Sequence, residues 1–233
     1  MFSDFKNFGS SWKSAWSNPA FRNQFVLTFL VFVGVMLSNF YYLRIWQTRP
    51  GIQLNDLILN LLPPHDFSPY IFFIQYTSLL IVFLFVLPNP HRLTKGLQMF
   101  AIVFLARTFT IYLVPLEPPR DMILLNDPVA TFVFHTSSVY VTKDLFFSGH
   151  VSACVLLWLI VDKKFLKVLL SFTTLTVGLL IMWQHVHYST DVLFAPLFAL
   201  TAYWMVQYAH AQSKYGLQTE SPAAVVAESE YFK

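Results

Sequence analysis

The chain has 233 residues, of which 56% are hydrophobic and only 12% are charged. Because soluble domains carry about 25% charged residues, this composition indicates an integral membrane protein. The net charge of +3 is modest and points to no nucleic-acid partner. The single cysteine, Cys154, excludes an internal disulfide bond. We therefore expect one domain embedded in the lipid bilayer with short tails, and the composition leaves its oligomeric state undefined.

Residues 1–23 form a segment distinct from the rest. Phe5, Phe8, Trp12 and Trp16 recur at helical spacing among polar residues and lysines. That pattern is typical of an amphipathic helix lying in the membrane interface, and an unstructured tail is the alternative. At the other end, residues 213–233 contain Ser, Glu, Ala and Pro, which predicts a disordered tail.

Between these tails, residues 24–212 contain six apolar runs. A helix needs about 20 apolar residues to cross the hydrocarbon core, and the runs fall at about 24–43, 69–88, 97–115, 147–161, 166–184 and 190–209. The fourth run is short. Proline pairs and the Asp162-Lys163-Lys164 triplet separate several of them. We therefore predict an all-α, polytopic membrane protein with six transmembrane helices.

The cations predict how these helices are oriented. Six crossings put both termini on one side. Ten Lys and Arg residues fall on that side, namely Lys6, Lys13, Arg22, Arg92, Lys95, Lys163, Lys164, Lys167, Lys214 and Lys233, and four fall on the other, namely Arg44, Arg49, Arg120 and Lys143. Because cytoplasmic loops carry an excess of Lys and Arg, we expect cytoplasmic termini and an outer (periplasmic or lumenal) face formed by loops 44–68, 116–146 and 185–189. The long loop 116–146 is either a substrate lid or a plain connector.

Two histidines and an aspartate lie at the outward ends of the predicted helices. His187 and Asp191 are four residues apart in "HYSTD", a spacing that stacks side chains on one helix face. A carboxylate that accepts from one imidazole nitrogen fixes the tautomer and leaves the other nitrogen free as a nucleophile. His150 lies at the same depth and on the same side, where it can donate a proton to a leaving oxygen. We predict a catalytic site of His150, His187 and Asp191; simple helix caps are the alternative.

Other residues nearby suit phosphate binding. Ser148 and Gly149 offer a hydroxyl and exposed backbone N–H groups. Arg107 lies within the third predicted helix, where a charge is costly and is therefore a functional candidate, although its side chain can also extend towards lipid headgroups. Its guanidinium suits clamping of phosphate oxygens. We expect Asp144 to orient the Ser-Gly-His turn, and Tyr188 to lie at headgroup level or touch substrate.

Together these segments resemble the type 2 phosphatidic acid phosphatase superfamily, and more closely its branch containing the sphingomyelin synthases. "KDLFFSGHVSA" is similar to that branch's Gly-Asp-x-x-x-Ser-Gly-His segment, with Lys143 in place of Gly. "HVHYSTDVLFA" resembles its His-Tyr-Thr/Ser-x-Asp-Val segment, and "RTFTIYLVP" resembles its Arg-x-x-Thr-x-Tyr-Val segment. The resemblance covers about residues 97–205.

The resemblance implies a six-helix bundle of that type and a phosphohistidine intermediate. His187 would be the nucleophile, Asp191 its orienting partner and His150 the acid-base group, with no metal or other cofactor. Two basic positions of the phosphatase branch are missing. Ile181 stands where an arginine would precede His187, and Tyr42 stands where a lysine would precede Arg49. These departures argue against an ordinary lipid phosphatase.

Three classes of function follow. The first is a phosphotransferase that moves a phospho-headgroup from a membrane phospholipid to a ceramide-like lipid and releases diacylglycerol; with water as acceptor, the same groups make a lipid phosphatase or a phospholipase C-type hydrolase. The second is a metal-dependent membrane enzyme using His185, His187, His135 and His150. The third is a non-catalytic lipid-binding protein. The acceptor depends on water exclusion and lipid access rather than on the triad.

Overall fold

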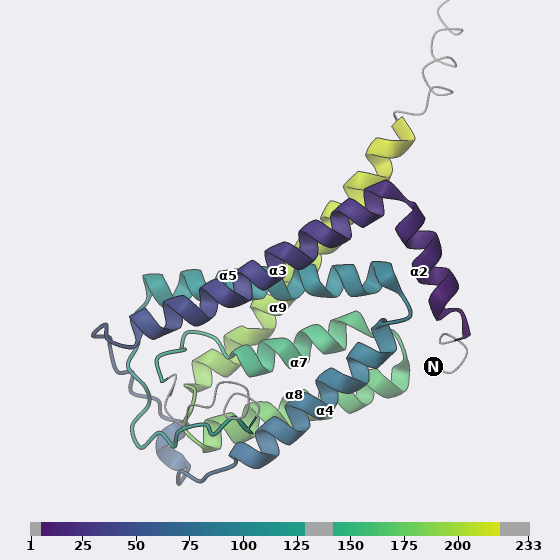
Figure 1. Ribbon diagram of the computed structural model, residues 1–233. Helices are drawn as coiled ribbons and strands as arrows, with labels where there is room; N and C mark the ends of the chain where they lie inside the picture. The colour runs from purple at the N-terminus through teal and green to yellow at the C-terminus, as the bar shows by residue number, and fades with distance from the viewer. Residues whose placement is uncertain (1–5, 129–141, 220–233) are drawn as a thin grey trace, which may run out of the picture.

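The computed structural model describes residues 6–128 and 142–219, and the described chain is helical apart from turns, loops and one isolated bridge between Ile52 and Leu116. The elements in chain order are α2 (Phe8–Ser17), α3 (Pro19–Trp46), the 3-10 turn η1 (Leu59–Leu61), α4 (Ser68–Val86), α5 (Pro90–Leu113), α7 (Gly149–Ile160), α8 (Lys164–Trp183) and α9 (Ser189–Thr219). The predicted all-α class is confirmed (Figure 1).

Five of these helices, α3, α4, α5, α8 and α9, are long and apolar enough to cross a membrane. The sixth apolar helix, α7, has only 12 residues, as the short fourth run predicted. The protein is thus a multi-pass membrane protein. The first and the last of these long helices extend beyond the ranges predicted from the sequence. Helix α3 begins at Pro19 rather than at 24, and α9 continues to Thr219, with its apolar part at Ser189–Gln212.

Local sequence explains where several helices begin. Pro90 occupies the first turn of α5, where its missing N–H has no cost, and the Asn89 side chain accepts from the Arg92 N–H at 3.0 Å. Ser148 caps α7 in the same way, since its hydroxyl accepts from the Val151 N–H at 3.4 Å. The start of α7, which carries His150, is therefore determined by the capping side chain of Ser148.

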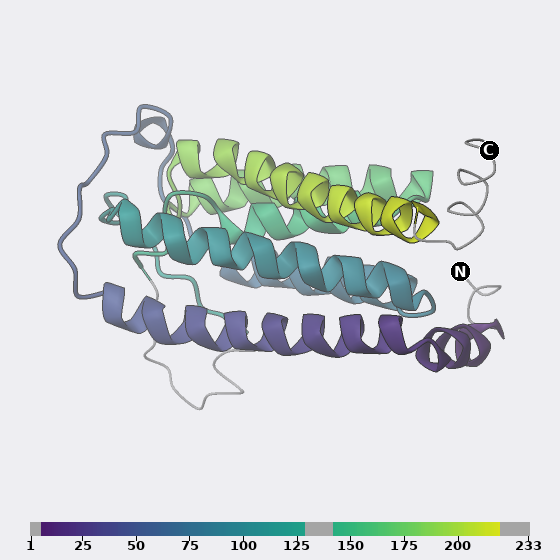
Figure 2. The same ribbon diagram turned by 90° about the horizontal axis from the view of Figure 1, so that it is seen from above.

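Helix α7 is the centre of the bundle. It packs against α4, α5, α8 and α9, whereas α3 lies along α5 at the periphery (Figures 1 and 2). Its Cys154 and Leu156 are completely buried. The outer helices instead expose large apolar side chains, such as Phe165 at 76% and Leu27 at 63%. In water such surfaces would be a liability, so they are surfaces for lipid.

The two ends of the bundle differ. Helix α2 lies at the same end as the C-terminal part of α9 (Figure 2). It is held there by the Trp12 indole N–H, which donates to the Leu87 carbonyl at 2.8 Å, and by an edge-on contact between Trp12 and Phe25. The opposite end carries the loops that follow α3, α5 and α8.

The loops of that opposite end are tied together around Glu117. One of its carboxylate oxygens accepts from the Lys143 ammonium at 2.7 Å and from the Gly51 N–H at 2.8 Å. These bonds lower the pKa of Glu117, and the bond from Lys143 has the larger effect. Lys143 also donates to the Arg49 carbonyl at 2.6 Å. Lys143, which replaces the glycine of the resembled segment, is thus a loop anchor.

Candidate active site

His187 and Asp191 form a buried pair at the start of α9. The His187 Nδ1 lies 3.1 Å from Asp191 Oδ2, and the two side chains are 3% and 1% exposed. The same carboxylate oxygen accepts from the Tyr188 N–H at 3.2 Å. Because α9 begins at Ser189, His187 precedes the helix and reaches Asp191 across the turn. In the described part of the chain the His187 Nε2 has no hydrogen-bond partner, so it is the nitrogen left for chemistry.

A backbone hydrogen bond couples this pair to the start of α7. The Ser148 N–H donates to the Asp191 carbonyl at 2.9 Å. Since the Ser148 side chain is completely buried and its hydroxyl caps α7, Ser148 positions the helix rather than offering its hydroxyl to a ligand. The structure thus gives this hydroxyl a helix-capping role, and phosphate binding by it stays a prediction.

Arg107 extends from α5 to the first turn of α7. Its guanidinium pairs with Asp144 and lies against Gly149, so closely that a β-carbon at 149 would collide with it. The guanidinium carbon is 5.9 Å from the centre of the Phe147 ring. Arg107 Nε and Asp144 Oδ1 are both buried and lack hydrogen-bond partners among the described residues. A buried guanidinium with a free N–H at a helix N-terminus is suited to an anion.

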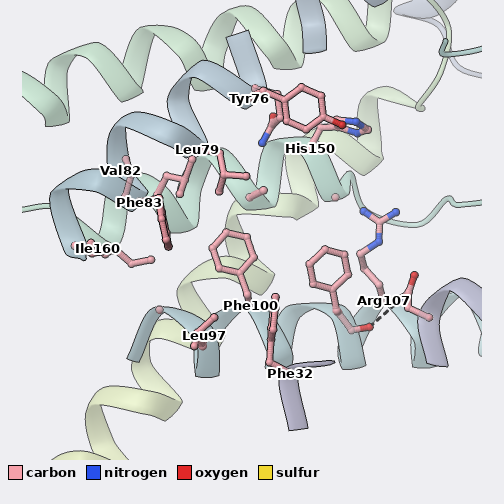
Figure 3. A pocket seen from close by; sticks show the side chains of 18 of the residues that line it. Phe32, Tyr76, Leu79, Val82, Phe83, Leu97, Phe100, Arg107, His150 and Ile160 are labelled. Carbon is pink, nitrogen blue, oxygen red and sulfur yellow. Dashed lines mark hydrogen bonds between the residues drawn. The ribbon is translucent and has the colours of Figure 1, made fainter. Parts of the chain in front are cut away.

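His150 faces the same space from the first turn of α7. Its ring contacts Phe72 edge-on, with centroids 5.8 Å apart. His187, Arg107 and Asp144 all lie near enough to act on it electrostatically. Figure 3 shows His150 and the predicted candidate Arg107 on two sides of the same cavity, and His187, in the turn before α9, is close enough to His150 to interact with it electrostatically.

Tyr188 does not reach this space. Its side chain is 1% exposed, and its hydroxyl accepts from the Leu54 N–H at 3.1 Å and donates to the Glu117 carbonyl at 2.8 Å. The expectation of headgroup or substrate contact is therefore corrected: Tyr188 fastens the α8–α9 turn to two loops. The aromatic ring made it look like an interface residue, but its phenol is used in the interior.

The metal alternative finds little support in the geometry. His185 presents Nδ1 to the Arg120 carbonyl at 2.9 Å and Nε2 to the Leu62 carbonyl at 3.0 Å, so both nitrogens are occupied. His135 lies outside the described residues. Within 6–128 and 142–219 no group of three or more His, Cys, Asp or Glu side chains is arranged to hold a metal ion.

Two residues at the site were missed in the sequence. The Tyr76 hydroxyl lies 2.8 Å from each carboxylate oxygen of Asp127, and both side chains share a cavity with His150. Tyr76 stacks on Phe72, the ring that contacts His150. Polar residues within the apolar run "YIFFIQYTS" were the available signal, because polar groups in membrane helices are costly and tend to be functional.

Comparison with known proteins agrees with this geometry. Residues 143–209 match the family described as PAP2 superfamily C-terminal. That range contains Asp144, the Ser-Gly-His turn and the His187–Asp191 pair, and it supports placement in the superfamily, whose members are generally phosphatases and phosphotransferases acting at membranes. No curated protein matches the chain.

Proposed function

We propose that this protein is an integral membrane lipid phosphotransferase of the sphingomyelin synthase-like kind. It would move a phospho-headgroup from a phospholipid to a ceramide-like lipid through a phosphohistidine intermediate. The observation that carries the proposal is the buried His187–Asp191 pair, which leaves His187 Nε2 without a hydrogen-bond partner among the described residues.

In the first half-reaction, His187 Nε2 attacks the phosphorus of the donor phosphodiester. The bond between phosphorus and the diacylglycerol oxygen breaks, and protonated His150 donates its proton to that oxygen. Asp191 holds the ring in the reactive tautomer and stabilises its positive charge. Arg107 and the free N–H groups at the start of α7 bind the phosphate oxygens, where negative charge develops.

In the second half-reaction, the hydroxyl oxygen of the acceptor attacks the phosphorus. The phosphorus–nitrogen bond breaks, His187 is regenerated, and the acceptor proton passes to His150, which is then ready for the next donor. Asp144 keeps the guanidinium of Arg107 in place through both steps. No step needs another reagent.

Two positions that are basic in the phosphatase branch are uncharged in this chain, and this difference supports transfer over simple phosphomonoester hydrolysis. Ile181 is completely buried in a core cluster with Ile71, Cys154 and Val177, and Tyr42 stacks on Trp46. Neither supplies charge to the site. A phosphodiester carries less charge than a phosphomonoester and needs fewer cations, which fits a single arginine. The hydrolase with water as acceptor is the second candidate, because the same groups would serve it.

We place the site on the outer face of the membrane and the termini in the cytoplasm. This orientation rests on the sequence count of ten Lys and Arg residues on the side of the termini against four in the loops on the side of the site, with Arg107 left out because it lies within a helix.

The test is headgroup transfer by the detergent-purified protein. Fluorescent ceramide is supplied with a panel of phospholipids and no added metal, beside His187→Ala and the control His210→Ala. His210 bonds to Gln98 at 2.8 Å and lies far from the site, on the C-terminal half of α9. We expect a phospho-ceramide whose formation falls by at least about 10³-fold in His187→Ala and is unchanged in His210→Ala. Release of headgroup without a ceramide product would identify a hydrolase, and equal turnover by both variants would contradict the proposed nucleophile.

A further inference from the structure

A cavity of about 430 Å³ leads away from the site into the bundle (Figure 3). Its polar end is formed by Arg107, Asp144, Gly149 and His150, together with Tyr76 and Asp127. Everything further in is almost entirely apolar, and Phe83, Phe100 and Ile160 are among the side chains that line it. A cavity with one polar end next to catalytic groups and a long apolar remainder has the polarity of a lipid.

The cavity has the length of a lipid chain. Its lining residues on α5 run from Arg107 to Leu93, and those on α4 run from Phe72 to Val86. At a rise of 1.5 Å per residue, each row is about 21 Å long. One leaflet of a bilayer contributes about 15 Å, half of the hydrocarbon core of about 30 Å. A chain whose phosphate is held at Arg107 would therefore fit within the cavity.

Two polar side chains along the wall have partners within the protein. Asn39 donates to the Thr108 hydroxyl at 3.0 Å, and the Gln75 side-chain oxygen accepts from the Cys154 thiol at 3.3 Å. The remaining wall further from the site is formed mainly by Phe, Leu, Ile and Val side chains. The volume lies at the lower end of the range for sites that hold one small ligand, which suits one acyl chain rather than a whole two-chain lipid.

The end of the cavity remote from His150 is closed by packed side chains. Gly96 lies there, and a β-carbon at this position would be 3.3 Å from Ile160 Cδ1. Leu93 and Ile160 pack against the buried cluster that contains Val86, Leu157 and Val161. Because packed cores yield little, this end is a fixed floor rather than an opening.

The side of the cavity is open between α3 and α4. Helix α3 packs along α5 and is not among the helices that pack closely with α4, yet Phe32 and Asn39 of α3 line the cavity opposite the α4 residues. Leu79 and Phe83 of α4 line it too and remain exposed, at 42% and 45%. An acyl chain can enter along this seam directly from the bilayer.

We propose that this cavity binds one acyl chain of the donor lipid and that its floor at Gly96 and Ile160 sets the longest chain accepted. The proposal rests on the proposed function, because it takes the polar end of the cavity as the place where the lipid phosphate reacts. Gly96 and Ile160 are specificity-determining residues that touch the end of the chain and no reacting atom.

The test compares chain-length profiles of two variants that move the floor in opposite directions. Gly96→Leu shortens the cavity, and Ile160→Ala deepens it. The control is Gly34→Leu on α3, where a new side chain meets nothing within 4 Å. Turnover is measured with a series of phosphatidylcholines of increasing acyl length, and native mass spectrometry of the same samples measures how much of each lipid is bound.

We expect Gly96→Leu to lower kcat/KM for long-chain relative to short-chain donors by about tenfold, which is the effect of no longer burying about two methylenes. Ile160→Ala should shift the optimum to longer chains, and Gly34→Leu should leave the profile unchanged. An unchanged profile in both Gly96→Leu and Ile160→Ala would overturn the proposal, and if Gly96→Leu failed to fold, an unchanged profile in Ile160→Ala would do so alone. Chain-selective retention that follows the two variants, without turnover by any protein, would instead overturn the proposed function and leave the acyl site standing.

Discussion

Gly149 determines how close the backbone of α7 comes to the guanidinium of Arg107. Its φ is not positive, so no special backbone conformation demands a glycine there; the requirement comes only from the space that Arg107 occupies. We predict that Gly149→Ala displaces the guanidinium and lowers headgroup turnover by about 10²-fold, the size of effect that a misplacement of about 1 Å produces. Turnover of the purified variant measures this.

Stability separates this effect from a folding defect. Displacing the buried guanidinium should also cost some stability, so turnover of Gly149→Ala is measured below its own unfolding temperature, which thermal unfolding in detergent provides. Gly34→Ala, at an open position on α3, should behave as the wild type in both assays. Full turnover by Gly149→Ala would mean that Arg107 is not needed at its observed position.

At the scale of elements, the start of α9 depends on a carboxylate from another loop. Asp56 Oδ2 accepts from the Ser189 N–H at 2.6 Å, and Oδ1 accepts from the Ile58 and Leu59 N–H groups at 3.0 and 3.2 Å. Burial alone raises the pKa of Asp56, but the hydrogen bonds from Ser189, Leu59 and Ile58 outweigh it and lower the pKa. A negative charge at this helix N-terminus is also favourable. Asp56 thereby holds the turn that carries His187.

We predict that Asp56→Asn lowers the free energy of unfolding by about 1 kcal/mol at neutral pH, because the amide keeps an acceptor but loses the charge. Since the folded pKa lies below the unfolded one, the stabilisation is present above the unfolded pKa near 3.8 and disappears as the pH falls through the folded pKa. Thermal unfolding in detergent should show a difference in stability between Asp56→Asn and the wild type at pH 7 that becomes smaller at acid pH. A gap of equal size at both pH values would contradict this role.

The control for that measurement is Asp162→Asn. Asp162 pairs with Arg92 at 2.9 Å, but its side chain is 59% exposed. Exposed ion pairs contribute little, so this variant should change stability much less than Asp56→Asn does.

The elements were predictable to different degrees. Apolar runs of membrane-spanning length indicated the helices, because span length is a local property. The His187–Asp191 spacing predicted their contact, although His187 lies before α9 rather than on it. The pairing of Arg107 with Asp144 was not predictable, since it requires α5 to pack beside α7. The interior position of Tyr188 likewise depends on two loops that no sequence periodicity describes.

At the scale of the whole molecule, the positive charge is divided between the two ends of the bundle. By sequence, ten Lys and Arg residues belong to the segments on the side of the termini and four to the loops on the side of the site, with Arg107 left out because it lies within a helix. Because loops rich in Lys and Arg stay in the cytoplasm and so set the orientation of a membrane protein, we predict that the loops around His187 face outward. The only native cysteine, Cys154, is completely buried and therefore gives a silent background for labelling.

Single cysteines at the two ends test this orientation. Asn60→Cys lies within η1 at the site end and Gln212→Cys lies on α9 at the other end, and both positions are exposed. A membrane-impermeant maleimide added to sealed cells, or to sealed lumen-out vesicles, should label Asn60→Cys at once and Gln212→Cys only after the membrane is opened. The reverse pattern would put the active site in the cytoplasm, where its donor would have to come from the inner leaflet. Labelling of both from outside would contradict an odd number of crossings between Asn60 and Gln212, and with it the predicted topology.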